Sequence, residues 1–279
     1  MVSDSVSVVI AMDEESGSFR TSLESILNQT HKATELLVIS DQSEVQPQLL
    51  KQHGNVKLIK SRSNNVASAF NSAIGFSTGE YIAFIDVHDV WPAEKLSQQV
   101  EALRSNPEVA LCYTEFENVV AQERSHETFE NKSLEDFFDI KTSTLENSYT
   151  SVFRSKIKDR DLAALVFVEQ ECIPISTVMI SRKSLPYTGL FDPLLEHAAT
   201  CDMWIKILRR FDAAKVSCSV VCSSEKASPS LDESSFDHTE IYSKYVQFGV
   251  ASDNRELVAY ATKLLGKSSS HIERCHQPS

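Results

Sequence analysis

Short apolar runs alternate with amphipathic segments through the first 113 residues of this 279-residue chain. The apolar runs are typical of buried strands, and the segments between them repeat apolar residues at helical spacing. We expect strands at 6–10, 35–39, 56–59, 81–85 and 109–113, and helices at 18–27, 66–76 and 94–103. Strands that alternate with helices predict an α/β fold with a parallel, doubly wound sheet.

The alternation breaks up after Tyr113. Residues 115–165 are polar and charged without a clear period, which predicts an insertion of loops and short helices. Beyond them we expect strands at 173–181 and 214–222, helices at 202–211, 241–250 and 255–265, a linker at 223–235, and a frayed tail from 267. The resulting organisation is a main domain over residues 1–225, followed by a linker and a small helical tail over 226–279.

Charge and glycine content exclude some classes of function. The net charge of −12 argues against a nucleic-acid-binding surface, where Lys and Arg must gather on one face. Only 7 glycines occur, so the fold cannot depend on glycine-rich phosphate loops. No signal peptide precedes the first strand, and no apolar run approaches the roughly 18 residues of a membrane span. We therefore expect a cytoplasmic protein.

The segment from Glu80 to Pro92 carries the clearest chemical signal. Its apolar run ends abruptly in Asp86, His88 and Asp89, where open α/β sheets bind ligands. In an extended segment, Asp86 and His88 would point to the same side. A carboxylate and an imidazole are both ligands for divalent metals, and such a metal could neutralise a nucleotide diphosphate. The alternative is that the aspartates only cap a helix that begins at Pro92.

Five segments in this order resemble the GT-A glycosyltransferases of family 2. They are Val6-Ser-Val-Val-Ile10, Leu23-Glu-Ser-Ile-Leu-Asn-Gln-Thr30, Leu36-Leu-Val-Ile-Ser-Asp-Gln-Ser43, the stretch from Gly79 to Leu96, and Gly189-Leu-Phe-Asp192 with Asp202-Met-Trp204. The resemblance covers about residues 5–215. It implies a GT-A nucleotide-binding core, with a mixed sheet flanked by helices and a small C-terminal helical appendage. It also implies inverting transfer of a sugar from a uridine- or thymidine-linked diphosphate donor to a saccharide or lipid-linked acceptor.

The resemblance assigns roles to four acidic or imidazole side chains. Asp41 matches the aspartate that helps to hold the nucleoside. Asp86 and His88 fall on the metal motif, usually Asp-x-Asp, which implies a Mn²⁺ or Mg²⁺ cofactor. A nitrogen ligand would favour Mn²⁺ over Mg²⁺. Asp89 matches the acidic residue near the donor sugar.

Several donor-side positions depart from the family pattern. Ala11 and Met12 replace the Pro and Thr or Ser that usually follow the first strand, at a nucleotide-binding position. Asn65 replaces a glycine, and Asn tolerates positive φ better than most residues. Phe70 replaces an arginine, which removes a donor expected to face the nucleotide.

The position of the catalytic base departs most from the family pattern. The family's Glu-Asp pair falls on Ala199 and Thr200, and a threonine hydroxyl cannot accept a proton at neutral pH. Glu196 and His197 lie just upstream and could replace the missing base. Asp202 is expected to be structural.

Other readings remain open at this stage. A degenerate member of the fold would bind a nucleotide-sugar or a partner without catalysis. A nucleotidyltransferase would need a basic, glycine-rich N-terminal loop, but residues 11–15 are acidic. Trp91 and Trp204 are expected to pack in the core rather than stack on sugar. The mixed charges of the C-terminal helices favour packing or homodimer formation over a membrane anchor, and leave peripheral membrane association open.

Overall fold

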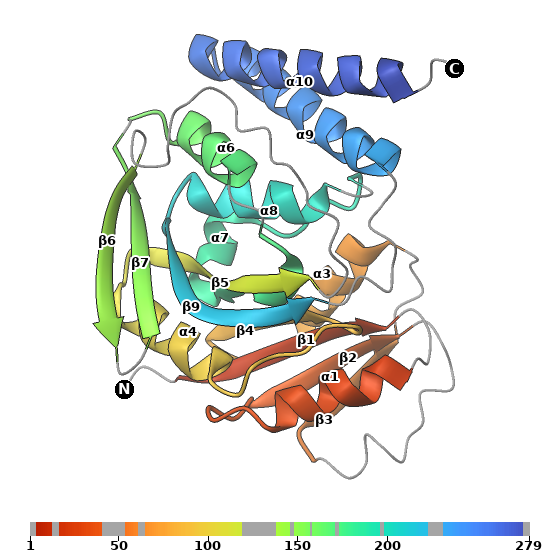
Figure 1. Ribbon diagram of the computed structural model, residues 1–279, viewed down its shortest axis with the longest axis vertical. Helices are drawn as coiled ribbons and strands as arrows, with labels where there is room; N and C mark the ends of the chain where they lie inside the picture. Colours follow the sequence, from red (N-terminus) through yellow and green to blue (C-terminus); the bar gives the residue numbers. More distant parts are fainter. Residues whose placement is uncertain are drawn as a thin grey trace.

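The computed structural model describes residues 4–12, 17–40, 54–60, 65–118, 138–145, 148–156, 158–170, 173–195, 198–222 and 231–275. Within these ranges nine strands form one mixed sheet, in the order β3-β2-β1-β4-β8-β5-β9-β7-β6 (Figure 1). The strands are β1 (Val6–Met12), β2 (Glu35–Ser40), β3 (Val56–Lys60), β4 (Tyr81–Asp86), β5 (Val109–Asn118), β6 (Phe138–Leu145), β7 (Ser148–Ser155), β8 (Met179–Ser181) and β9 (Asp212–Cys222). The predicted α/β class with a mixed, helix-flanked sheet is confirmed.

Strand direction brings several strand ends to one edge of the sheet. β3, β2, β1 and β4 are parallel, whereas β8 is antiparallel to both β4 and β5. Ala11 in β1 pairs with Ile39 of β2 on one side and with Asp86 of β4 on the other. The carboxyl ends of these three strands therefore lie side by side, as the sequence pattern predicts.

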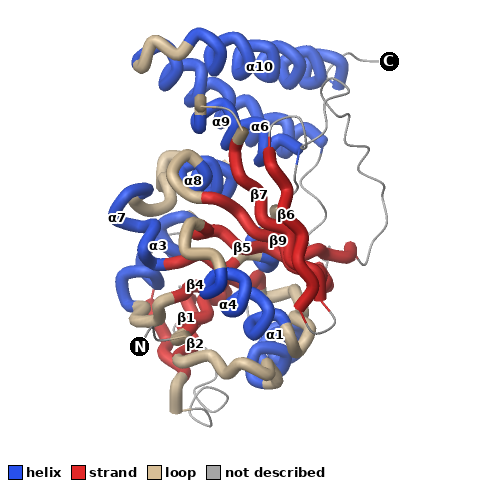
Figure 2. The backbone as a smooth tube through the Cα atoms, turned by 90° about the vertical axis from the view of Figure 1, so that its left-hand side faces the viewer, coloured by secondary structure: helices blue, strands red, loops and turns tan. Residues whose placement is uncertain are grey.

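Helices cover both faces of the sheet (Figure 2). Val8 and Ile10 of β1 belong to one buried cluster and Val9 to the other, because successive side chains point to opposite faces. One face is covered by α1 (Gly17–Leu27) and α4 (Lys95–Ser105), and the other by α3 (Val66–Phe76), α6 (Arg160–Gln170) and α8 (Ala199–Leu208). Short turns complete this part of the chain, namely η1 (Ile175–Thr177), η2 (Arg182–Ser184) and α7 (Leu185–Thr188).

Residues 115–165 are the clearest error of the sequence analysis. β5 continues to Asn118, and β6 and β7 pair along their whole length as an antiparallel ladder. The strands escaped notice because the sequence of β6 is mostly polar and shows little apolar alternation. Phe138 of β6 and Phe153 of β7 are buried, and both rings pack on Phe167 of α6 at 5.2 Å between centroids. Contacts distant in sequence, rather than local period, stabilise this hairpin.

The C-terminal helices pack onto the sheet domain. α9 (Leu231–Ala251) and α10 (Arg255–Cys275) lie together above α6 and α8 (Figure 1). Ile241, Tyr242 and Leu257 belong to the same buried cluster as the sheet residues. Both helices are longer than predicted. α9 begins inside the expected linker, α10 continues through the expected frayed tail, and the predicted boundary at 225/226 lies outside the described residues.

Candidate active site

A tight turn follows β4 at the edge where the strand ends meet. The carbonyl of Asp86 accepts a hydrogen bond from the N–H of Asp89 at 3.1 Å, and its Oδ1 accepts one from the N–H of His88 at 3.0 Å. The expectation that Asp86 and His88 belong to one extended segment is therefore wrong. A short aspartate side chain competes for nearby backbone donors and favours such a turn.

Buried side chains from other elements hold this turn in place. The hydroxyl of Ser22 in α1 donates to the carbonyl of Asp89 at 2.6 Å. The hydroxyl of Ser176 in η1 accepts the N–H of Asp86 at 2.8 Å. The indole of Trp91 donates to the Ser176 carbonyl at 2.8 Å, and its ring is 3% exposed. The turn is thus preorganised by α1 and η1, and Trp91 packs in the core as expected.

Capping does not explain the two aspartates. α4 begins at Lys95, and its N-cap is Glu94, whose side chain makes no capping hydrogen bond. Asp86 and Asp89 therefore do not serve as caps of this helix. The reading in which they only start the helix at Pro92 is wrong.

Asp86 and His88 offer two of the ligands that a divalent cation needs. Both residues are partly exposed, and the Asp86 carboxylate keeps lone pairs beyond the one that accepts from His88. No group of three or more His, Cys, Asp or Glu side chains within the described ranges could hold a metal. A cation held by these two residues would need its remaining ligands from elsewhere, such as the oxygens of a diphosphate, because octahedral Mn²⁺ or Mg²⁺ takes oxygen ligands.

The backbone conformation of Asn65 differs from the positive φ that a replaced glycine suggested. Its φ is −93°, so this position does not need the left-handed conformation of a glycine. Instead its Oδ1 caps α3 by accepting the N–H of Ser68 at 3.1 Å, and its Nδ2 donates to the carbonyl of Pro193 at 3.0 Å. The oxygen thus caps α3, and the nitrogen connects the start of α3 to the loop before α8.

The substitution at Phe70 has a structural explanation. Its ring is 3% exposed and packs against Phe84 at 5.3 Å and Phe191 at 5.4 Å between centroids. Trp204, fully buried as expected, packs against both Phe84 and Phe191. Position 70 therefore lies in the core of this chain, where the phenyl ring packs and no donor is offered.

Thr200 occupies the second position of α8 and is partly exposed. The carboxylate of Asp202, two residues further on, is fully buried. It forms ion pairs with Lys206 at 3.0 Å and Lys244 at 2.7 Å. These contacts agree with the expected structural role of Asp202 and leave it no access to an acceptor.

The other candidate site residues are known only by their positions in the sequence. Asp41, Glu196 and His197 lie outside the described residues, and so does the side chain of Ala11. The backbone of Ala11 lies next to Asp86, and Asp41 follows the end of β2, the strand beside β1.

The sequence analysis missed Ser22 and Ser176, the buried serines that hydrogen-bond to the turn, since isolated serines carry no motif.

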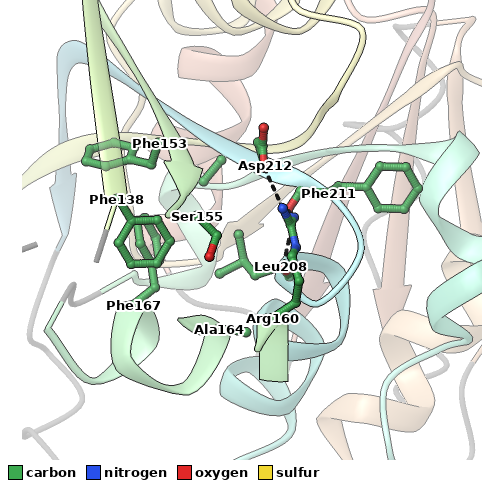
Figure 3. Close-up of a pocket in the computed structure, with 10 residues that line it drawn as sticks. Phe138, Phe153, Ser155, Arg160, Ala164, Phe167, Leu208, Phe211 and Asp212 are labelled. Carbon is green, nitrogen blue, oxygen red and sulfur yellow. Dashed lines mark hydrogen bonds and ion pairs between the residues drawn. The ribbon is translucent and has the colours of Figure 1, made fainter. Parts of the chain in front are cut away.

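A small pocket opens elsewhere on the molecule (Figure 3). Its lining includes Phe138, Phe167, Arg160 and Asp212, and its cavity volume of about 10 Å³ leaves room for about one water. Arg160 donates to Asp212 at 3.1 Å within it. Asp212 begins β9, which is parallel to β5, so this pocket lies at the sheet edge opposite Asp86. It is too small for a nucleotide.

The described helices include none that is long and apolar enough to cross a membrane.

Comparison with known proteins identifies relatives in sequence and fold. The WfgD protein of Escherichia coli, a UDP-Glc:alpha-D-GlcNAc-diphosphoundecaprenol beta-1,3-glucosyltransferase, is 23% identical over 81% of this chain and 78% of its own length. The uncharacterized glycosyltransferase YibD of E. coli K12 is 31% identical, but the match spans only 38% of this chain and 33% of YibD.

Solved structures share the fold. S. aureus TarS 1-349 in complex with UDP superposes with a TM-score of 0.60 at 15% identity, covering 95% of this chain and 70% of that chain. Its complex with UDP-GlcNAc gives a TM-score of 0.58. Residues 7–161, more than half of the chain, match the sequence profile of Glycosyl transferase family 2. The parallel strands, the Asp86–Asp89 turn and this match lead to one conclusion: the chain belongs to glycosyltransferase family 2.

Proposed function

We propose that this chain transfers a sugar from a uridine diphosphate sugar, or its thymidine counterpart, to a lipid-linked or saccharide acceptor. The observation that carries the proposal is the Asp86–Asp89 turn, preorganised beside the end of β1 in a family 2 chain. The names of the relatives support the substrate classes. WfgD acts on a diphosphoundecaprenol-linked sugar, and TarS has been solved with UDP and UDP-GlcNAc.

In this proposal the donor nucleotide lies over the carboxyl ends of β1, β2 and β4. Asp41 accepts a hydrogen bond from the base or the ribose, and Asp89 lies near the donor sugar. Asp86 and His88 hold the Mn²⁺ or Mg²⁺ ion. When bound, the cation balances the negative charge that develops on the leaving diphosphate.

The chemistry is a single displacement with inversion. The acceptor hydroxyl attacks the anomeric carbon, and the bond to the diphosphate breaks with its electron pair on the leaving oxygen. The hydroxyl proton must pass to a base, which Thr200 cannot provide. We assign this role to Glu196 or His197, which precede Thr200 by a few residues.

Calorimetry with UDP, in the presence of Mn²⁺ and then of EDTA, tests the donor site. We expect binding that the cation strengthens. UDP release from a panel of nucleotide-sugars, with and without lipid-linked acceptors, then tests transfer. Absence of binding to every common nucleoside diphosphate at millimolar concentration would refute the proposal.

A second candidate is a domain that binds a nucleotide-sugar without transferring it. The favouring observation is at α8, where Thr200 stands at the base position and the nearby carboxylate of Asp202 is buried between two lysines. Donor binding without UDP release, for any donor and acceptor tested, would favour this reading over transfer.

A further inference from the structure

Charged side chains join α9, α8 and the loop before α8. Lys244 of α9 forms ion pairs with Asp192 at 2.8 Å and with Asp202 at 2.7 Å. The second carboxylate oxygen of Asp202 pairs with Lys206, and the hydroxyl of Tyr245 lies 3.4 Å from the first. Asp202 is fully buried, while the Lys244 side chain is 34% exposed. One ammonium group from α9 therefore bridges the loop before α8 and the first turn of α8.

The same loop is held from its other side by α3. The amide of Asn71 makes two hydrogen bonds to the backbone of Phe191, and Asn65 donates to the carbonyl of Pro193. Phe191 and Pro193 flank Asp192, so the loop is connected both to α3 and to Lys244. Position 200 lies between Asp192 and Asp202 in the chain, and both of these residues are bound by Lys244.

We propose that Lys244 is a positioning residue that sets the first turn of α8, and with it position 200, relative to the donor half of the site. The catalytic part of this inference rests on the proposed function, whereas its structural part does not. α9 then belongs to the acceptor half of the enzyme and is more than an appendage.

The physical argument concerns a buried carboxylate. Without Lys244, Asp202 would keep Lys206 but lose the ion pair to its Oδ1, inside a water-excluded region. Removing one of its two cationic partners leaves the buried charge of Asp202 less compensated, which the structure relieves by moving the carboxylate toward water. Asp202 lies in the first turn of α8, so this movement would displace the backbone around Thr200. Displacements of about 1 Å can cost up to about a hundred-fold in rate.

The experiment compares three variants of the full chain. Lys244→Met keeps most of the length of the side chain and removes the charge, whereas Lys244→Arg keeps a cation that can bridge both carboxylates. Tyr242→Phe is the matched control on the same helix, because it removes the hydroxyl that donates to Glu169 of α6 but leaves Asp202 untouched. Hydrogen exchange measured by mass spectrometry, UDP affinity and transfer kinetics are recorded for each.

We expect Lys244→Met to raise amide exchange several-fold in residues 190–206, with residues 81–89 unchanged. The kcat of transfer should fall about ten- to a hundred-fold, while the KM for the donor stays within about two-fold. Lys244→Arg should restore most of the rate, and Tyr242→Phe should leave exchange at 190–206 unchanged.

Two results would overturn the inference. One is unchanged exchange in residues 190–206 of Lys244→Met. The other is an equal change in Tyr242→Phe, which would mean that Lys244 does no more than dock α9. If the wild type binds no nucleotide, the proposed function fails separately, and the exchange result still decides whether Lys244 positions α8.

Discussion

Asn71 and Phe191, 120 residues apart in sequence, form a two-bond connection between an amide side chain and a backbone. Nδ2 of Asn71 donates to the carbonyl of Phe191 at 2.8 Å, and its Oδ1 accepts the N–H of Phe191 at 2.9 Å. One side chain thereby satisfies both polar backbone groups of a buried residue. This contact joins α3 to the loop before α8.

Asn71→Ala should lower the free energy of unfolding by about 2 kcal/mol or more, because it leaves two backbone groups of Phe191 unpaired. Urea denaturation measures the change. Ser72→Ala on the same helix is the matched control, since its hydroxyl bonds only to the Ser68 carbonyl at 2.9 Å. We expect the control to stay within about 0.5 kcal/mol of the wild type. Equal destabilisation by both variants would contradict this role of Asn71.

Glu35 makes the stability depend on pH. Burial alone would raise the pKa of Glu35, but hydrogen bonds from Lys57, Ser7 and Thr78 outweigh it and lower the pKa from 4.5 to about 2. A lowered pKa in the folded state stabilises the fold above pH 4.5, and this stabilisation is lost as the pH falls toward 2. We expect it to reach at most about 3 kcal/mol at neutral pH.

Glu35→Gln should therefore be less stable than the wild type at pH 7, and the difference should shrink between pH 4.5 and pH 2. Urea denaturation across this range measures it, and Glu24→Gln, on the exposed side of α1, is the control. A difference that stays constant across the range would show that the charge of Glu35 is not responsible.

Thr200→Asp should raise the rate of transfer if the rest of the site is intact. A positioned general base contributes roughly a hundred- to ten-thousand-fold, and a gain within this range is expected. Thr200→Asn is the matched control, because its amide has a similar shape and cannot accept the proton. UDP release with a saturating acceptor measures both. A brisk wild-type rate that survives loss of both Glu196 and His197 would mean that the base lies elsewhere.

His88→Ala should remove most of the affinity for UDP that Mn²⁺ adds, a loss of at least about ten-fold. Affinity in EDTA should stay within about two-fold of the wild type, because only the cation site is changed. His31→Ala serves as control, since the His31 ring contacts the Asp4 carbonyl near the start of β1. Calorimetry decides it, and an unchanged gain from Mn²⁺ in His88→Ala would exclude His88 as a ligand.

The local sequence pattern was sufficient to predict those strands whose apolar residues are neighbours along the chain. The apolar runs of β1, β2 and β4 are short, continuous and followed by polar residues, so their place in a parallel sheet was predictable. Asp86 at the end of β4 was predictable for the same reason. Family 2 membership followed from motifs in a fixed order, which a single sequence can display.

Tertiary structure decided what depends on partners distant in the chain. From the sequence, Phe70 only replaces the arginine of the family pattern. The structure shows that its ring packs against Phe84 and Phe191. The β6–β7 hairpin has little alternation of its own, and its aromatic residues become core only against α6. Lys244 shows no motif, because its role comes from two carboxylates that lie 42 and 52 residues away. The sequence alone determined the class of the fold and the family, through local period and motif order. Which charged residues join α9, α8 and the loop before α8 was decided by packing, because ion pairs between distant residues have no local signature.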